Sequence, residues 1–248
     1  ITMKTITYAV GVFLSFGAIS TYAETLTKTF KAGQIKSLKL NNSHGSVTIE
    51  GKTSPEAKVE VTKIKWSKNC ALEIRQDGGV IDASVTKKSV SSPLMSNDCQ
   101  VNFHVVVPSK IDLIAENGSG NINISNINGC LEIVLGSGDL TMQKVDSEKI
   151  KCQLGSGDLS IDGIIRSVDI KVGSGDINLV YRKVPTTGAV TIKSGSGNAN
   201  ISLPAESKIR VDFNAGSGKL ACELDQLQNA PYAIFMNAGS GDLRIKKL

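Results

Sequence analysis

One tripeptide, Gly-Ser-Gly, occurs seven times in the last 131 residues of this chain and constrains its fold more than any other feature. Neighbouring copies begin 18 to 23 residues apart, which is typical of one coil of a β-solenoid and short for a strand-helix unit. The repeat therefore predicts a stack of equivalent coils. The paired outer glycines of the seven copies are Gly118 and Gly120, Gly136 and Gly138, Gly155 and Gly157, Gly173 and Gly175, Gly195 and Gly197, Gly216 and Gly218, and Gly239 and Gly241.

Each copy lies at the same place in an alternation of apolar and polar residues. The first, third and fifth residues before the triplet are usually apolar, as are the fourth and sixth residues after its first glycine. Because successive side chains of a strand point to opposite faces, these residues share one face. Each coil is thus predicted to consist of a strand, a corner, a second strand and a return loop, with aliphatic side chains inside.

The glycines are interpreted as structural corners, because a sharp bend needs a positive φ that glycine adopts without a steric clash. A flexible Gly-Ser linker would not keep phase with an apolar stripe. A dinucleotide-binding loop would need a third glycine three residues after the second, where residues such as Thr141 and Ser160 stand instead.

The N-terminus has the pattern of an export signal. Lys4 precedes the apolar stretch from Ile6 to Ile19, and small residues lead to Ala23. We expect residues 1–23 to be a Sec signal peptide that is cleaved after Ala23. A retained membrane anchor is the alternative, but the apolar stretch is shorter than the roughly 20 residues that a spanning helix needs. No later segment is predicted to cross a membrane.

The predicted fold class is all-β, a single-stranded right-handed parallel β-helix with about 18–23 residues per coil. The handedness follows from the general bias of parallel crossovers. Residues 24–117 are expected to form an N-terminal cap and irregular coils, and residues 118–248 the regular coils, all within one continuous domain, 24–248. The segment 42–49 resembles a degenerate corner, so the coils are expected to begin near residue 40.

The last coil in the sequence has Phe235 on the outward phase and Leu243 and Ile245 on the inward phase. This coil is therefore expected to leave an exposed sheet edge at the end of the solenoid. Such an edge predicts a homo-oligomer formed through the C-terminal coil.

The five cysteines can be sorted by the same alternation. Cys152 and Cys222 fall on inward positions three coils apart, so they are expected to be buried thiols out of reach of each other. Cys130 falls on an outward position and has no partner in phase. By elimination Cys70 and Cys99 are the candidate disulfide, which an exported protein permits.

A column of Asp and Asn follows the corners and is the strongest candidate for a metal site. In stacked coils Asp139, Asp158 and Asp176 would lie about 4.8 Å apart, and like charges at this spacing repel unless a cation lies among them. A calcium ladder is one interpretation. The other is that Asp and Asn accept hydrogen bonds from backbone N–H groups at the corner. Non-acidic members of the column favour the second: Asn121, Asn198 and Lys219, beside the further acidic residue Asp242.

Other outward positions suggest surface roles. Glu132, Lys151 and Asp169 alternate in sign on successive coils, which stabilises the stack. The column from Asn123 to Asn200 is small and polar, which suits either adsorption to a glycan or another surface, or simply a face that stays soluble. The net charge of +5 is mild and the basic residues are scattered, which argues against nucleic acid as a partner.

No catalytic or cofactor motif is found. The two histidines, His44 and His104, both lie in strand-like runs, which argues against a metal site or a Ser-His-Asp triad. Gly157-Asp158-Leu159-Ser160 lacks the strand-elbow-helix context of a hydrolase nucleophile.

The run from Val105 to Ile124, followed by repeated Gly-Ser-Gly-Asp coils, resembles the bacterial putative-adhesin β-strand-repeat family, relatives of the head-GIN-domain putative autotransporter adhesins. The resemblance covers roughly residues 40 to 248. It implies an exported parallel β-helix with a surface or adhesive role, and it brings no catalytic residues.

Three function classes follow. The favoured one is an exported, non-enzymatic protein of the cell envelope, periplasmic or secreted, that binds a surface, glycan or protein partner. The second is a structural scaffold that assembles through the solenoid ends. The third is a carbohydrate-active enzyme, which rests on analogy between β-helices alone.

Overall fold

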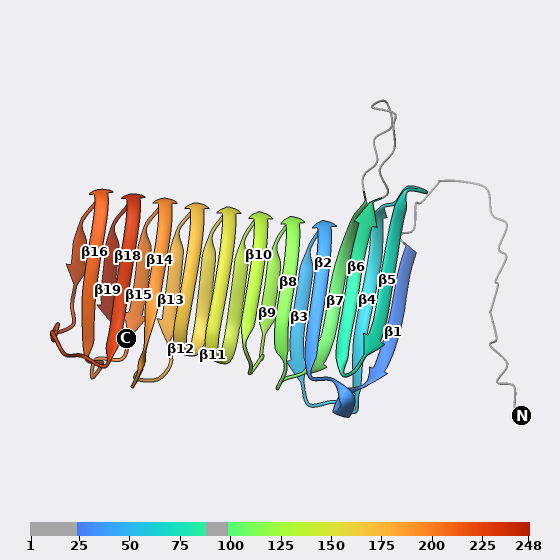
Figure 1. The fold of residues 1–248 in the computed structure, drawn as a ribbon, viewed down its shortest axis with the longest axis horizontal. Helices are drawn as coiled ribbons and strands as arrows, with labels where there is room; N and C mark the ends of the chain where they lie inside the picture. The colour runs from blue at the N-terminus through green and yellow to red at the C-terminus, as the bar shows by residue number, and fades with distance from the viewer. Residues whose placement is uncertain (1–23, 88–98) are drawn as a thin grey trace, which may run out of the picture.

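The computed structural model describes residues 24–87 and 99–248, which form an elongated, flattened stack of strands (Figure 1). The predicted signal peptide, residues 1–23, lies outside the described residues. The described part is almost entirely strand, with one short 3-10 helix, η1 (Ala32–Gln34). It contains no helix with the length and apolar character needed to span a bilayer.

Two sheet faces run the length of the stack. Successive coils pair in parallel, as the repeat predicts. The first face contains, in spatial order, β5 (Cys70–Asp77), β6 (Val80–Lys87), β2 (Ser37–His44), β8 (Asp112–Ser119), β10 (Leu131–Ser137), the second halves of β11 (Leu140–Ser156) and β12 (Leu159–Ser174), β14 (Gly188–Ser196), β18 (Tyr232–Ser240) and β16 (Ile209–Ser217).

The second face is joined to the first through the Gly-Ser-Gly corners. It contains, in spatial order, β1 (Glu24–Lys31), β4 (Glu56–Lys65), β7 (Gln100–Pro108), β3 (Val47–Lys52), β9 (Ile122–Ser125), the first halves of β11 and β12, β13 (Ile177–Tyr181), β15 (Ala199–Leu203), β19 (Leu243–Lys247) and β17 (Leu220–Cys222).

The core between the two faces consists of stacked aliphatic columns. Ile133, Cys152, Ile170, Ile192 and Met236 follow one another in register, and each is at most 2% exposed. Each coil covers the apolar face of its neighbour, so the core is continuous along the stack. The inward phase predicted from the alternation is confirmed in every regular coil except the outermost one.

The coils at the C-terminal end do not stack in sequence order. β18 pairs with β14 on one side and with β16 on the other, and β19 lies between β15 and β17 in the same way. The last coil in the sequence is therefore inserted between the two coils that precede it (Figure 1). Leu243 and Ile245, predicted to leave an exposed edge, are at most 1% exposed. The open edge belongs to β16 and β17 instead.

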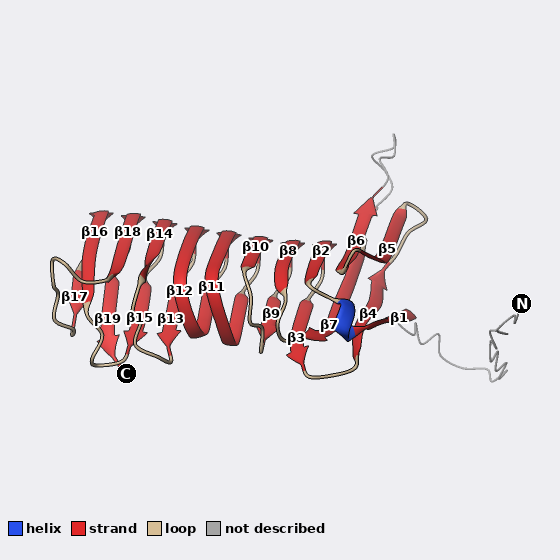
Figure 2. Cartoon of the chain, turned by 60° about the horizontal axis from the view of Figure 1, so that its bottom comes forward, coloured by secondary structure: helices blue, strands red, loops and turns tan. Residues whose placement is uncertain are grey.

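The N-terminal end also departs from the prediction. The first coil, β2 with β3, begins at Ser37 as expected, but it is inserted between the coil of β8 and β9 and strands β6 and β7. Beyond it lie antiparallel strands rather than irregular coils: β4 pairs antiparallel with β1 and β7, and β5 with β6 (Figure 2). Apolar alternation is the same in parallel and antiparallel strands, so the sequence pattern did not separate them.

A disulfide closes this N-terminal cap. Cys70, at the start of β5 on the first face, is bonded to Cys99, just before β7 on the second face, with their Cα atoms 5.7 Å apart. This is the pair that the elimination argument singled out. The bond links the two faces where no Gly-Ser-Gly corner joins them.

Candidate binding surface: the corner edge and the junction hollow

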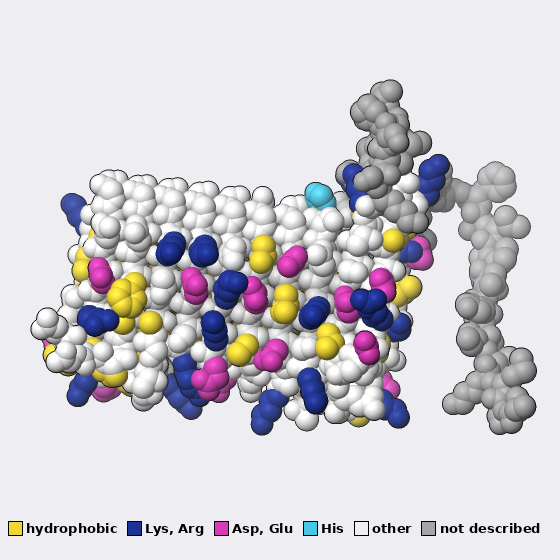
Figure 3. All heavy atoms as spheres, viewed as in Figure 1, with side chains coloured by type: hydrophobic (Ala, Val, Ile, Leu, Met, Phe, Trp, Pro, Cys, Tyr) yellow, Lys and Arg dark blue, Asp and Glu magenta, His cyan; other side chains and the backbone are white. Residues whose placement is uncertain are grey.

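The seven Gly-Ser-Gly corners and the segment Ser43–Gly45 line up along one rim of the stack, which we call the corner edge. The central serines pair in register from coil to coil, and His44 takes the equivalent place in the first coil. Figure 3 shows this rim as a strip of backbone and small side chains without coloured charged or apolar groups, apart from the histidine at one end. The corners themselves therefore carry no charged side chain, and the Asp and Asn column follows directly beside them.

The two glycines of each corner are needed for different reasons. The second, such as Gly157, has a positive φ of 121°, as a sharp bend requires. The first, such as Gly155, has no positive φ. A Cβ atom on Gly155 would lie 2.4 Å from the carbonyl oxygen of Gly136 in the neighbouring coil. The sequence argument identified only the first of these reasons, the bend, whereas close backbone stacking accounts for the other glycine.

The Asp and Asn column forms a hydrogen-bonded ladder between coils. The backbone N–H of Asp158 donates to Oδ1 of Asp139 at 3.1 Å, and that of Asp176 donates to Oδ1 of Asp158 at 2.8 Å. The same contact joins Asp139 to Asn121 and Asn198 to Asp176. The side chains thus cap the N–H groups of the next coil, which corresponds to the second interpretation of the column.

The calcium interpretation finds no support in this geometry. Each acidic residue of the predicted site, Asp139, Asp158 and Asp176, already has an oxygen engaged by the next coil. Within the described ranges, no three His, Cys, Asp or Glu side chains gather closely enough to hold a metal ion.

The ladder also explains the lysine in the column. The backbone N–H of Asp242 donates to Oδ1 of Asn198, and the backbone N–H of Lys219 donates to Oδ1 of Asp242 at 2.9 Å. Lys219 is therefore the last residue of the ladder. A lysine side chain cannot accept a hydrogen bond. It is tolerated in the outermost coil because no further coil there presents an N–H. Lys219 is therefore the sequence signal for the inverted order of the last two coils.

Replacing Asp158 by alanine is expected to cost about 1–2 kcal/mol, because the N–H of Asp176 loses its acceptor. Asp158→Asn keeps an acceptor oxygen and is expected to match the wild type. Chemical denaturation with calcium and with chelator measures both. A calcium-dependent stabilisation of the wild type that Asp158→Asn abolishes would contradict the hydrogen-bonding role.

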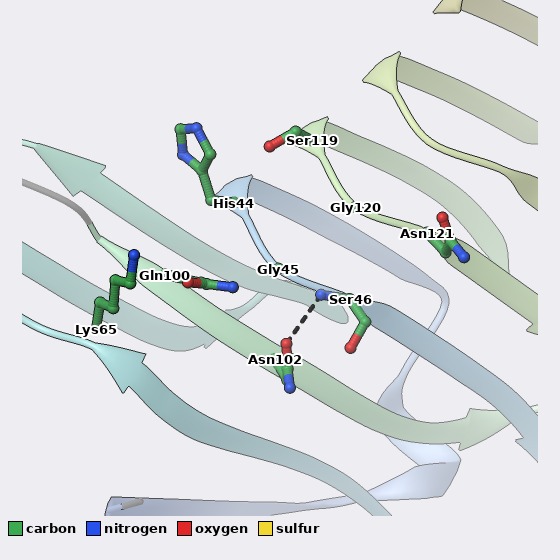
Figure 4. A pocket seen from close by; sticks show the side chains of 9 residues that line it. All are labelled: His44, Gly45, Ser46, Lys65, Gln100, Asn102, Ser119, Gly120 and Asn121. Atoms are coloured by element: carbon green, nitrogen blue, oxygen red, sulfur yellow. Dashed lines mark hydrogen bonds between the residues drawn. The ribbon is translucent and has the colours of Figure 1, made fainter. Parts of the chain in front are cut away.

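A hollow of about 490 Å³ interrupts the corner edge where the cap meets the regular coils. We call it the junction hollow. It forms because β7 enters beside the corner of β2 without a corner of its own, with Gln100 in register with His44. Its lining is polar (Figure 4) and consists of His44, Gly45, Ser46, Lys65, Gln100, Asn102, Ser119, Gly120 and Asn121.

Side chains from three parts of the chain are fixed around the hollow. Asn102 accepts a hydrogen bond from the backbone N–H of Ser46 at 2.9 Å, a contact of the same kind as those in the ladder (Figure 4). Beneath the rim, buried Asn117 donates to the carbonyl oxygens of Gly45 and Gly120 at 2.9 and 3.0 Å. Buried Asn42 donates in the same way to the carbonyl oxygen of His44 at 3.1 Å. The two amides hold the corner backbone that surrounds the hollow.

Sequence reasoning did not find this hollow. His44 does line it, whereas His104 lies on the outside of the second face, in register with Thr48. One feature of the sequence could have pointed to it. Asn42 and Asn117 are polar residues at an inward position that leucine or valine occupies in neighbouring coils.

The outward columns have the predicted register. Lys151 donates to Glu132 at 2.6 Å, and this contact raises the pKa of the Lys151 ammonium. On the second face Asn123, Thr141, Ser160, Asn178 and Asn200 follow one another in register. This polar column continues into Arg244, again because the last coil is inserted.

The remaining cysteines are not gathered into a site. Cys152 is fully buried, and this burial raises the pKa of its thiol well above the ordinary range. Cys130 is exposed, as expected. Cys222 was expected to be buried but is half-buried, because its coil is the outermost. One more coil separates Cys222 from Cys152 than the sequence order predicted.

Several solved structures are similar to this one. A structure described as a putative adhesin from Bacteroides fragilis covers 91% of this chain and 97% of its own, with a TM-score of 0.56 and 12% identity. Two structures from Parabacteroides distasonis, described as a putative adhesin and a putative lipid binding protein, have TM-scores of 0.49 with 13% and 14% identity. They cover 89% and 90% of this chain and 97% and 96% of their own. At 12% identity, the likeness to the Bacteroides fragilis structure shows a common fold alone.

No curated protein matches the chain. The family model described as Toastrack DUF4097 matches residues 72–246, which is well over half of the sequence. This match and the adhesin-like structures bear out the resemblance to a putative-adhesin repeat family. With its all-β, solenoid-like stack and this match, the chain belongs to the Toastrack DUF4097 family.

Proposed function

We propose that this protein is an exported, non-enzymatic protein of the cell envelope that binds a neutral glycan in the manner of an adhesin. The coils are taken to be right-handed, following the general bias of parallel crossovers. Export rests on the signal-like residues 1–23, with cleavage after Ala23. The names of the similar structures agree with a role in binding at the cell surface.

The observation that carries the proposal is the junction hollow at the end of an uncharged edge. Its volume lies in the range of small-molecule sites, and its lining offers amide, hydroxyl and imidazole groups as donors and acceptors, together with the ammonium group of Lys65 as a donor. Sugar hydroxyl groups are matched by such groups. The flat corner edge next to it leaves room for the rest of a polymer to extend along the stack.

The test compares glycan binding by the wild type with that of His44→Ala and Gln100→Ala. Both variants are expected to bind a neutral glycan at least about tenfold more weakly, because each removes a polar group from the hollow. His104→Ala is the matched control, since this exposed histidine lies on the second face outside the lining.

Glycan-array binding followed by calorimetry with the best ligand measures the effect. If His44→Ala and Gln100→Ala bound the glycan as tightly as the wild type, the hollow would not be the binding site. If no glycan on the array bound, the proposal that the protein binds a glycan would be contradicted.

A scaffold function is the second candidate, favoured by one observation. The coil of β16 and β17 leaves its outer side open, which suits assembly through the solenoid end. The enzyme alternative has no comparable support, since no cluster of catalytic side chains lines the hollow.

A further inference from the structure

The C-terminal end of the stack exposes a cross-section of the core. Val211, Phe213 and Ala215 point inward in β16 but are only half-buried. Their register neighbours in β18, Ile234, Met236 and Ala238, are buried. Leu220 of β17 is 38% exposed. In the described part of the chain no further coil covers these side chains. Unsatisfied sheet edges of this kind readily pair with another strand.

Only the start of this edge is occupied. Gln226 forms a parallel bridge with Ile209, and the backbone N–H of Leu227 donates to the carbonyl oxygen of Ile209 at 2.9 Å. The free edge of β16 therefore runs from residue 210 to residue 217. Phe213 lies near its centre.

Among the described residues, the opposite end of the stack offers no matching edge. There the last strands are β1 and β5, which run antiparallel to their neighbours. β5, which ends the same face as β16, carries Glu73, Arg75 and Asp77, and β1, which ends the other face, carries Glu24, Lys28 and Lys31. Charged residues on an edge strand oppose further pairing. Head-to-tail stacking into a fibre is thus disfavoured, whereas pairing of two open ends is self-complementary and stops at two copies.

We propose that the free edge of β16 pairs antiparallel with the same edge of a second copy of this chain, about a two-fold axis through Phe213. In this register inward residues meet inward residues, with Val211 opposite Ala215 of the second copy. On the outside Asp212 faces Asn214, and Arg210 faces Gly216, so no like charges meet. The pairing covers the exposed core and satisfies the free backbone groups of both edges.

This pairing does not depend on glycan binding. It nevertheless gives the protein a second feature of an adhesin, because the junction hollows lie toward the opposite ends of the two stacks. A dimer would present two separated sites, and two linked sites bind a repetitive surface more tightly than one.

The test uses opposite charges at one exposed position. Asn214→Asp places a second carboxylate against Asp212 at both symmetric contacts and is expected to weaken the dimer about tenfold. Asn214→Lys places an ammonium there and is expected to strengthen it by a similar factor. Asn237, in register with Asn214 on the adjacent β18, is the matched control, and its Asp and Lys variants are expected to change the dimer constant less than about twofold.

Sedimentation equilibrium of the purified protein over a concentration series measures all five proteins, and circular dichroism verifies their folding. Opposite shifts for the two Asn214 variants support the proposal. A wild type and an Asn214→Lys variant that stay monomeric up to millimolar concentration would overturn it. The proposal would also be overturned if the Asn214 and Asn237 variants shifted the dimer constant equally, or if none of them shifted it, because the interface would then lie elsewhere.

Discussion

Gly157→Ala is expected to lower the free energy of unfolding by about 3 kcal/mol or more. Two costs add up in this variant: a strained backbone and a steric clash. Gly157 has a φ of 121°, and a Cβ atom there would lie 2.0 Å from the carbonyl oxygen of Gly138. That oxygen belongs to the backbone of the neighbouring coil, so neither coil can move away without breaking the inter-coil ladder.

Three other glycines separate the two causes. Gly155→Ala tests the clash alone, since its Cβ would lie 2.4 Å from the oxygen of Gly136 without a positive φ. Gly78→Ala tests the backbone alone: its φ is 53° and nothing lies within 4 Å, so about 1 kcal/mol is expected. Gly33→Ala, which meets neither obstacle, is expected to be close to neutral.

Chemical denaturation followed by circular dichroism ranks the four variants. The expected order of destabilisation is Gly157→Ala first, then Gly155→Ala, Gly78→Ala and Gly33→Ala. If Gly157→Ala cost no more than Gly78→Ala, the corners would not be stacked in close backbone contact.

A charge in the middle of the core is the other change with a large expected effect. Ile170 is fully buried between Cys152 and Ile192 in the central column. Ile170→Asp is expected to cost about 4 kcal/mol or more, because an unpaired carboxylate is taken out of water and the aliphatic column is broken. The loss of one coil also removes the surface on which both neighbouring coils pack.

Gln153→Asp is the matched control, because Gln153 lies outward on a neighbouring coil in register with Lys171. Its new carboxylate gains a favourable neighbour, so a change within about 0.5 kcal/mol is expected. Thermal unfolding and limited proteolysis report both variants. Equal stability of the two would mean that the inward and outward phases are assigned wrongly.

The alternation in the sequence was sufficient to predict which side chains are buried in the regular coils. From Leu131 to Ile161 each inward position is determined by the period of a strand and by the place of the corner. The position of the disulfide could be predicted for the same reason, because the other cysteines have a definite phase in regular coils.

The order of the coils could not be predicted from the repeat, since equivalent corners fit against one another in any order. Only Lys219, which lacks an acceptor for a further coil, distinguishes the outermost coil. The junction hollow was missed for a related reason. It is built from segments around His44, Gln100 and Ser119, which meet only because the first coil is inserted between later ones.

Pairs of engineered cysteines at the central serines of the corners test the stacking and its order most directly. Ser196 is in register with Ser240, and Ser240 with Ser217, so Ser196 and Ser217 lie two coils apart. Adjacent coils are about 4.8 Å apart, which suits a disulfide, whereas two coils exceed its reach. In a background with Cys130→Ser, Ser196→Cys with Ser240→Cys should cross-link on oxidation, and Ser196→Cys with Ser217→Cys should not. Cross-linking of the second pair in place of the first would contradict the inserted coil, and cross-linking of neither would contradict the stack itself.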